Sequence, residues 1–191
     1  MATLEAPAGI SSRLPQGRFR NEPLIDFSRD EAASRAMRAA IEKVRSELGR
    51  EYDLVIGGRR SRTSGKITSI NPARPSQVVG IHQKAGAEHA GPAVEAALAA
   101  FENWKQTAAE ERAGLLLRTG DLLRERKFEF EAWLVFEVGK NWAEADGDIA
   151  ETIDFCEFYS REALRLAHVE TPVQLPGSAT CCATSRWAWG Q

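Results

Sequence analysis

Apolar residues recur every three or four positions in five segments of this chain, which is the spacing of helices that each bury one face. The first segment runs from Ser28 to Gly49, and the second begins near Pro92, a residue suited to the first turn of a helix. The other three follow closely between Thr107 and about residue 167. The side chains expected on apolar faces are Met37, Ala40, Ile41, Val44, Leu48, Val94, Ala97, Leu98, Phe101, Trp104, Leu115, Leu116, Leu122, Leu123, Ile149, Ile153, Cys156 and Tyr159. The pattern predicts a mostly helical chain.

Capping residues indicate where these helices begin and end. Three pairs have the spacing of a capping box: Ser28 with Glu31, Thr107 with Glu110, and Asn141 with Glu144. Glycines stand where two of the apolar patterns stop, at Gly49 and Gly139. A glycine in the left-handed conformation commonly ends a helix, so we expect Gly139 to be such a C-terminal cap.

Between residues 50 and 83 the pattern changes to short runs rich in β-branched residues. "YDLVIGG" and "KITSINP" are joined by the polar segment "RRSRTSG", which predicts a β-hairpin formed by these two runs, followed by a turn at Asn71-Pro72. "SQVVGIHQ" predicts a third strand. The chain is therefore expected to carry a hairpin before its long helical part.

Composition restricts the function classes. The net charge of −2 and the lack of a basic cluster argue against a nucleic-acid partner. The chain has no run of about 18 apolar residues and no leader-like apolar segment, so we expect no membrane partner and a cytoplasmic location. Residues 1–20 are rich in Pro, Gly, Ser and Arg without periodicity and are expected to form a flexible arm. His82, His89 and His168 lie far apart, which argues against a metal site.

The cysteines do not form a recognisable reactive site. Cys156 lies between apolar residues on a predicted helix and is interpreted as a packing residue. Cys181 and Cys182 are adjacent, and no feature near them predicts a lowered thiol pKa. No Gly-x-Gly-x-x-Gly follows a strand, so no dinucleotide-binding residue can be assigned.

The order of these motifs resembles the N-terminal part of the aldehyde dehydrogenase superfamily. The resemblance rests on "YDLVIGG", "SINPARPSQVVG", the helical run that ends in "FEVGKN", and "EADGDIAETIDFCEFYSREALRL", which lie within residues 21–177. "RNEPLIDFS", "EVGKNW" and "ETIDFCEFY" are most similar to the members that oxidise glutamate semialdehyde, the 1-pyrroline-5-carboxylate dehydrogenases. The resemblance implies an α/β fold in which residues 21–177 are part of a Rossmann-like cofactor domain.

The resemblance also implies an enzyme of proline catabolism that oxidises a small-molecule aldehyde with NAD through a cysteine thiolate. In the superfamily the nucleophilic cysteine, the general-base glutamate and the phosphate-binding glycines come after the part that this chain matches. No catalytic or cofactor-binding residue is therefore assigned here, and the chain is expected to be inactive alone. The complete enzyme is expected to form a homo-oligomer.

One residue of this chain matches a substrate-binding position of the subfamily. Glu151 corresponds to a glutamate that lines the aldehyde entrance, where its carboxylate can meet the ammonium group of the substrate. The alternative is that Glu151, Asp148 and Asp154 only form a solvated acidic face of a helix.

Residues 178–191 differ in character from the rest of the chain and are expected to be a frameshifted tail. Trp187-Ala188 and Trp189-Gly190 each conceal a glycine codon in the neighbouring reading frame, and "Tyr-x-Pro-Leu-Gly-Val-Gly" is compatible with that frame. The superfamily has such a sequence at about this distance. Two competing interpretations of the chain are a non-catalytic helical module that binds a partner through apolar helix faces, and a member of another aldehyde dehydrogenase subfamily.

Overall fold

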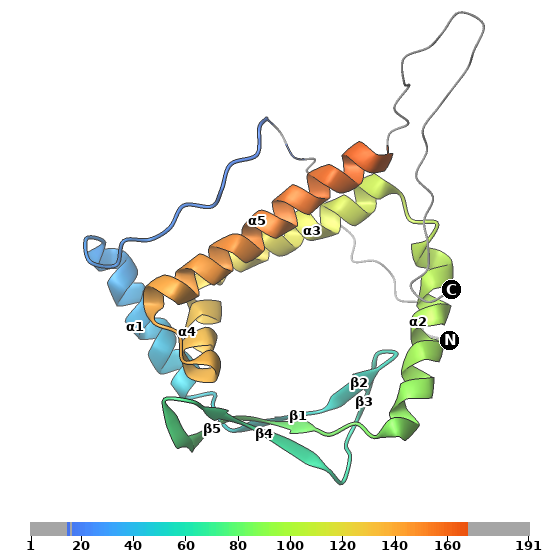
Figure 1. Ribbon diagram of the computed structural model, residues 1–191, viewed down its shortest axis with the longest axis horizontal. Helices are drawn as coiled ribbons and strands as arrows, with labels where there is room; N and C mark the ends of the chain where they lie inside the picture. The colour runs from blue at the N-terminus through green and yellow to red at the C-terminus, as the bar shows by residue number, and fades with distance from the viewer. Residues whose placement is uncertain (1–14, 16, 168–191) are drawn as a thin grey trace, which may run out of the picture.

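The computed structural model describes residues 15 and 17–167 of the protein and shows long helices with two small sheets along one edge of the molecule (Figure 1). In chain order the elements are α1 (Glu31–Arg45), β1 (Arg50–Tyr52), β2 (Leu54–Ile56), β3 (Arg59–Ser61), β4 (Lys66–Asn71), β5 (Arg74–Gln83), η1 (Ala87–His89), α2 (Ala90–Trp104), α3 (Ala109–Glu125), α4 (Lys127–Val138) and α5 (Trp142–Ala167). Helices α3 and α5 lie side by side, α1 packs on α4, and α2 stands on the opposite side. The predicted mostly helical chain is confirmed.

The strand pairing differs from the predicted hairpin. β2 pairs with β3 through a two-residue turn at Gly57-Gly58, while β4 pairs antiparallel with β5 and β1 pairs parallel with β5. Both turn glycines have positive φ, at 56° and 76°, which is the geometry of a tight hairpin turn. The first run therefore folds back at once onto residues 59–61, and the predicted pairing of "YDLVIGG" with "KITSINP" is wrong. The third strand is confirmed.

Two of the three predicted capping boxes are wrong. The side chain of Asp30 caps α1 by accepting a hydrogen bond from Ala33 N at 2.8 Å, whereas Ser28 donates to Asp26. Ala108 precedes α3, and the Thr107 hydroxyl donates back to the carbonyl of Asn103. In both cases the hydroxyl donates a hydrogen bond to an acceptor on the preceding segment, and this bond competes with capping of the helix.

The hydrophobic core lies where α1, α4 and β5 meet. Val44 of α1, Val79 of β5, and Ala132 and Phe136 of α4 form one buried cluster. Ala40, Ile41, Leu48 and Trp133 pack against it. Met37 is also fully buried, so the predicted inner face of the first helix is confirmed.

Helices α3 and α5 pack through small residues, not through the predicted leucines. The buried positions of α3 are Ala109, Ala113, Gly114, Leu117 and Gly120, and those of α5 include Ile149, Ile153, Cys156 and Ser160. Leu115, Leu116 and Leu122 are exposed, and so is Tyr159. Small side chains let the two helices approach closely, and this contact buries the side of α3 that is turned away from Leu115 and Leu122. The predicted inward face of α3 and the inward placement of Tyr159 are therefore wrong.

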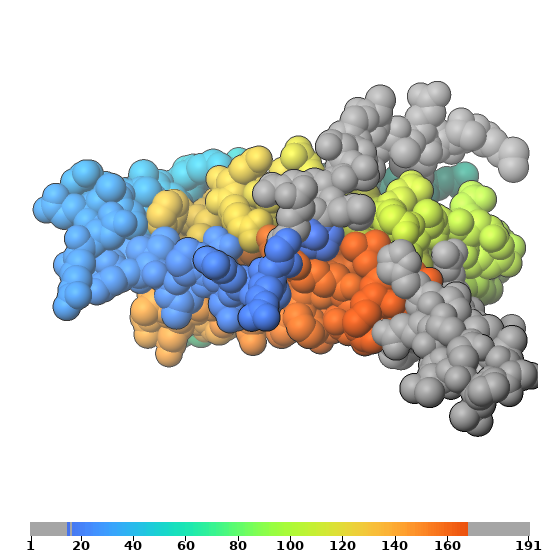
Figure 2. Space-filling model, turned by 90° about the horizontal axis from the view of Figure 1, so that it is seen from above, coloured from blue at the N-terminus to red at the C-terminus, as the bar shows by residue number. Residues whose placement is uncertain are grey.

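Helix α2 forms as predicted but has no buried residue. Its main contacts are with η1 and β2. On the other side of the molecule, the segment of residues 17–28 lies across the surface of α5 and α3 (Figure 2). This segment therefore covers part of the α3–α5 pair, whereas α2 has no such covering segment among the described residues.

Candidate functional site

The start of α5 is held by a glycine turn and a capping box. Gly139 ends α4 in the left-handed conformation, with φ 76° and ψ 23°. A Cβ atom at this glycine would lie 2.9 Å from Cγ of Pro72, so only glycine fits beside the β4–β5 turn. Asn141 Oδ1 then accepts a hydrogen bond from Glu144 N at 3.0 Å, and Glu144 Oε2 accepts one from Asn141 N at 3.4 Å. Both predictions, the glycine cap and this capping box, are confirmed.

Three acidic residues follow at intervals of three along α5, and two of them are engaged. The Asp148 carboxylate forms an ion pair with Lys140. Asp154 accepts hydrogen bonds of 2.7 Å from the Asn21 side chain and from Glu22 N. Glu151, the predicted substrate-binding residue, lies between them and is exposed. No hydrogen bond or ion pair joins Glu151 to any other residue within the described part of the chain, which leaves its carboxylate open to a ligand.

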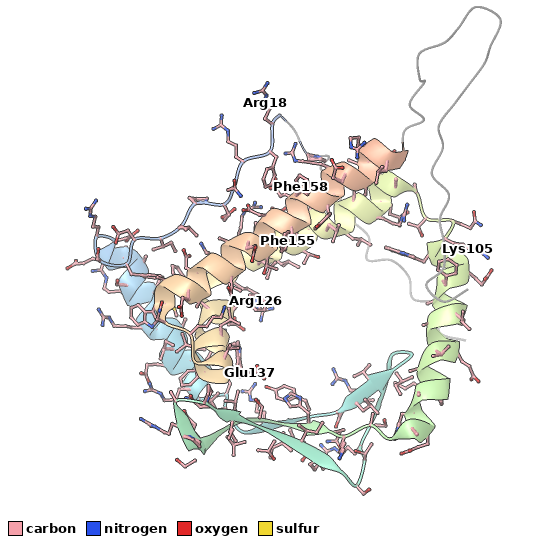
Figure 3. The ribbon with its side chains drawn as sticks, viewed as in Figure 1. Arg18, Lys105, Arg126, Glu137, Phe155 and Phe158 are labelled. Carbon is pink, nitrogen blue, oxygen red and sulfur yellow. The ribbon has the colours of Figure 1, made fainter. Side chains whose placement is uncertain are left out.

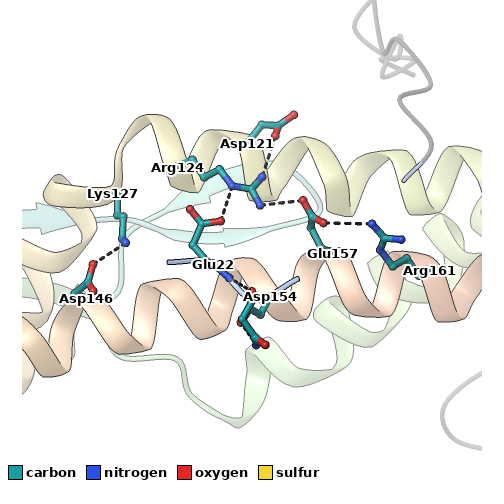
Figure 4. Close-up of polar contacts among 9 residues, drawn as sticks. Glu22, Asp121, Arg124, Lys127, Asp146, Asp154, Glu157 and Arg161 are labelled. Carbon is teal, nitrogen blue, oxygen red and sulfur yellow. Dashed lines mark hydrogen bonds and ion pairs between the residues drawn. The ribbon is translucent and has the colours of Figure 1, made fainter. Parts of the chain in front are cut away.

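An arginine on α3 ties the N-terminal segment to both long helices (Figure 4). Arg124 Nε lies 2.8 Å from Glu22 Oε2, and Arg124 Nη2 lies 2.9 Å from Glu157 Oε1 on α5. Asp121 completes the group at 3.2 Å. These charges are about one third exposed or less, so the network is stronger than a fully solvated pair. It keeps residues 21 and 22 in contact with α5 near Asp154.

A buried charge cluster near the start of α5 was not predicted from the sequence. Glu131 of α4 is 0% exposed and Asp146 of α5 is 1% exposed. Lys127 Nζ lies 2.6 Å from Asp146 Oδ1, and Ile25 N donates to Asp146 Oδ2 at 2.9 Å. Asp146 shares the helical spacing of the buried Ile149 and Ile153, and that spacing was the available sign of its burial.

The protonation of Glu131 is set by this environment. Burial, and after it the negative charge of Asp146, raise the pKa of Glu131 from its ordinary value of 4.5 to about 7, although the positive charge of Lys127 opposes the shift. Neither carboxylate oxygen of Glu131 accepts a hydrogen bond from the residues that the structure describes. The protonated form can donate to Asp146, and this favours a shared proton below neutral pH.

Cys156 is buried at the α3–α5 contact, and burial raises the pKa of its thiol. A Cβ atom on Gly120 would lie 3.5 Å from Cys156 Cβ, so the thiol fills space between the helices. The interpretation of Cys156 as a packing residue agrees with this position, and a buried thiol with a raised pKa is a poor nucleophile. Cys181, Cys182 and His168 lie outside the described residues.

The two remaining histidines have local partners. His82 stacks on Tyr52 with ring centroids 5.2 Å apart, and His89 Nδ1 accepts a hydrogen bond from Gly86 N. Within residues 17–167 no group of three potential ligands could hold a metal ion. Nor does any helix in that range have the length and apolar character needed to cross a membrane.

Two of the hollows on the described surface are lined by residues other than Glu151. One of about 400 Å³ lies between the β2–β3 hairpin and α2 and is lined in part by Ile56, Arg59 and Pro92. The other, of about 190 Å³, is lined by Tyr52, Val79, Gly80, His82, Trp133 and Glu137. Glu137, at the end of α4, accepts a hydrogen bond from Ser69 and thereby joins that helix to the sheet (Figure 3).

Comparison with known proteins places this arrangement in a family. A family model described as "Aldehyde dehydrogenase family" matches residues 59–190, more than half of the chain. The chain belongs to the aldehyde dehydrogenase family. The matched range includes most of residues 178–191, so it marks no boundary at Ser178.

This chain is similar in sequence and structure to several aldehyde dehydrogenases of known type. The 1-pyrroline-5-carboxylate dehydrogenase of Geobacillus thermodenitrificans is 51% identical over 148 residues, which are 78% of this chain and 28% of that protein. The structure of 1-pyrroline-5-carboxylate dehydrogenase from Thermus with bound NAD is 50% identical and covers 86% of this chain and 32% of that one, with a TM-score of 0.78. Proline utilization A from Bdellovibrio bacteriovorus has 36% identity and a TM-score of 0.80 over 86% of this chain and 17% of that one.

These aldehyde dehydrogenases are much longer than the present chain. It spans 28% of the length of the Geobacillus relative. The arrangement of the helices and the small sheet nevertheless agrees with that of the Thermus protein over 86% of this chain. The expected resemblance to this superfamily is therefore confirmed at the level of both sequence and fold.

Proposed function

We propose that this chain forms the N-terminal part of the cofactor-binding domain of an NAD-dependent 1-pyrroline-5-carboxylate dehydrogenase, which oxidises glutamate semialdehyde to glutamate. The observation that carries the proposal is the 50% identity and TM-score of 0.78 to the Thermus protein, whose structure contains NAD. The complete enzyme would bind NAD and form a homo-oligomer, as the family resemblance implies.

Within this function, Glu151 is the residue that meets the substrate. Its carboxylate is exposed and has no partner among residues 17–167, whereas the neighbouring Asp148 and Asp154 are engaged by Lys140 and by the N-terminal segment. An unpaired carboxylate on a helix with a firmly capped start suits the ammonium group of glutamate semialdehyde. The bonds of Asp148 and Asp154 fix the helix to Lys140 and to the N-terminal segment, and the charge of Glu151 is left for the ligand.

The 191-residue chain by itself is proposed to be inactive. By family resemblance, the nucleophilic cysteine and the general base lie outside the residues that match, and Cys156 is buried with a raised thiol pKa. We expect no NAD reduction above the buffer rate when the purified chain is mixed with glutamate semialdehyde. Measurable turnover would contradict this part of the proposal.

A single-chain chimera tests the function directly. Residues 21–177 replace the matching part of the Geobacillus thermodenitrificans enzyme, and the chimera is expected to reduce NAD with glutamate semialdehyde. Glu151→Gln should raise KM for this substrate about tenfold, with kcat within about twofold, because an ion pair to the ammonium group is lost.

Two controls isolate the role of Glu151. Glu162→Gln changes a carboxylate on the same helix that is already bonded to Arg165, and it should leave KM unchanged. An aldehyde of similar size without an amino group should show the same KM with and without Glu151→Gln. An equal rise in KM for both aldehydes would show that Glu151 acts on the fold and not on the ammonium group.

The frameshift at residues 178–191 remains a separate prediction, and these residues lie outside the described ones. Sequencing of the coding DNA checks it. We expect the neighbouring frame to continue into the rest of a dehydrogenase. A stop codon at once in that frame would refute the idea.

A further inference from the structure

The N-terminal segment, residues 17–28, is bonded to carboxylates of α5 at two places. Asp154 accepts hydrogen bonds of 2.7 Å from the Asn21 side chain and from Glu22 N. Further along the segment, Asp146 Oδ2 accepts a hydrogen bond of 2.9 Å from Ile25 N. Asp154 is partly exposed, whereas Asp146 is buried. The attachment at Ile25 therefore depends on charges that water screens little.

The carboxylate that holds Ile25 belongs to a cluster of two acids and one cation. Asp146 and Glu131 are both buried, and Lys127 Nζ lies 2.6 Å from Asp146 Oδ1 (Figure 4). The side chain of Lys127 is itself only 11% exposed. When both acids are ionised, negative charge exceeds positive charge in a place that water does not reach. Two carboxylates in this situation favour the state in which one of them holds a proton.

The elements around the cluster direct their other charged groups elsewhere. The charges that act on Glu131 among the described residues are Asp146 from α5 and Lys127 from its own helix. The remaining groups near these elements have different partners: Lys43 of α1 and Arg126 after α3 bond to Glu129, Arg38 of α1 lies over the Trp142 ring, Glu137 accepts from Ser69 of β4, and Asp26 accepts from Ser28. The two acids therefore compete for one ammonium group.

The bond to Asp146 lies within a short loop, residues 23–26, that is fixed on both sides. Before the loop, Glu22 is bonded to α3 and to α5. After the loop, the carbonyl of Phe27 accepts a hydrogen bond of 2.7 Å from the Ser34 hydroxyl of α1. The loop can therefore open without release of the rest of the segment.

We propose that Glu131, Asp146 and Lys127 form a proton-operated latch, in which a proton shared by the two acids keeps Ile25 bonded to Asp146, and loss of that proton opens residues 23–26 over the start of α5. A second buried negative charge without its own cation is costly, and an open loop lets water reach both carboxylates at the loss of one hydrogen bond. The latch is independent of the proposed function, because it involves neither substrate nor cofactor.

The latch is expected to open near neutral pH. Burial, and after it the charge of Asp146, raise the pKa of Glu131 from 4.5 to about 7. A group whose pKa is raised by the closed structure stabilises that structure below its ordinary pKa. This stabilisation is lost as the pH rises through about 7.

Hydrogen–deuterium exchange of the full 191-residue chain tests the latch. Exchange is measured at about pH 6 and at about pH 8.5, is resolved to single amides and is corrected for the intrinsic effect of pH. The protection factor of the Ile25 amide should fall about tenfold between these two values, because about one proton is released on opening. The amide of Glu22, which is bonded to Asp154, should change less than about twofold.

Two substitutions isolate the proton from other effects of pH. Glu131→Gln and Asp146→Asn each remove one ionisable group and keep an oxygen that can accept a hydrogen bond. Either should leave the protection of Ile25 equal at the two pH values, so one folded variant is enough. Glu137→Gln is the matched control, because Glu137 is an exposed carboxylate on the same helix. It should keep the full fall in protection.

Three results would overturn the proposal. The first is equal protection of Ile25 at both pH values in the unaltered chain. The second is a fall in protection that persists after Glu131→Gln or Asp146→Asn. The third is a fall of the same size at Glu22, which would show that the whole segment leaves the helices and not the loop at Asp146.

Discussion

Two regions of the molecule, the junction where α1, β5 and α5 pack around α4 and the separate helix α2, contain equally regular helices, yet of the two only the junction has an interior. Met37, Val44 and Phe136 are buried at the junction, together with two carboxylates. Every residue of α2 retains exposed surface. The helices themselves follow from local sequence, whereas burial requires a second layer. The difference indicates which part of the chain is stabilised by its own tertiary contacts.

The largest effect is expected from removing a core side chain at the junction. Met37→Ala should lower the free energy of unfolding by about 3 kcal/mol, because the fully buried side chain leaves a cavity. Urea titration followed by circular dichroism measures the change. Met37→Leu keeps most of the volume and should cost less than about 1.5 kcal/mol. A loss below about 1 kcal/mol for Met37→Ala would show that the junction is not the stable part of the chain.

The buried carboxylate of Glu131 is expected to make the junction sensitive to pH. Its pKa is raised to about 7 in the folded chain by burial and by Asp146, above the ordinary 4.5. The folded state therefore holds the proton more tightly than the unfolded state. The stability from this group is fully present below pH 4.5 and is lost as the pH rises through 7.

Glu131→Gln should therefore raise the free energy of unfolding at pH 8 by about 2 kcal/mol and change it little at pH 4. Urea titrations at the two pH values measure this. Glu129→Gln is the control of opposite sign, since Arg126 and Lys43 lower the pKa of Glu129 to about 2. That substitution should destabilise the chain at neutral pH. If Glu131→Gln destabilises the chain equally at both pH values, the carboxylate is ionised and well paired.

The helices and the glycine cap could be predicted from sequence because their determinants are local. Apolar spacing places Met37 and Val44 on one face, and Gly139 marks the end of α4. The hairpin was mispredicted because the two glycines at 57 and 58 form a turn by themselves, so the polar residues after them become a strand. Such a choice depends on backbone conformation more than on apolar pattern.

The candidate site divides in the same way. The position of Glu151 on a capped helix could be predicted from sequence spacing. The lack of a partner for its carboxylate could not be predicted, because it depends on Lys140 and the N-terminal segment engaging Asp148 and Asp154 instead. The burial of Asp146 and Glu131 was missed because charged residues are usually exposed. The face of α3 that is buried here was missed because apolar residues occupy both sides of that helix.

A smaller effect is expected at the start of α5. Asn141→Ala removes the hydrogen bond that Glu144 N donates to Asn141 Oδ1 and should lower the free energy of unfolding by about 1 kcal/mol. Asn141→Asp keeps the acceptor and should restore most of the loss. An equal loss for both substitutions would show that the side-chain cap does not hold the helix.

The smallest effect is expected in α2. Leu98→Ala should change the free energy of unfolding of the isolated chain by less than about 0.5 kcal/mol, because the side chain is 57% exposed and alanine favours helix. A cost in the isolated chain as large as that of Met37→Ala would mean that α2 is already packed, and the contrast between the two regions would fail.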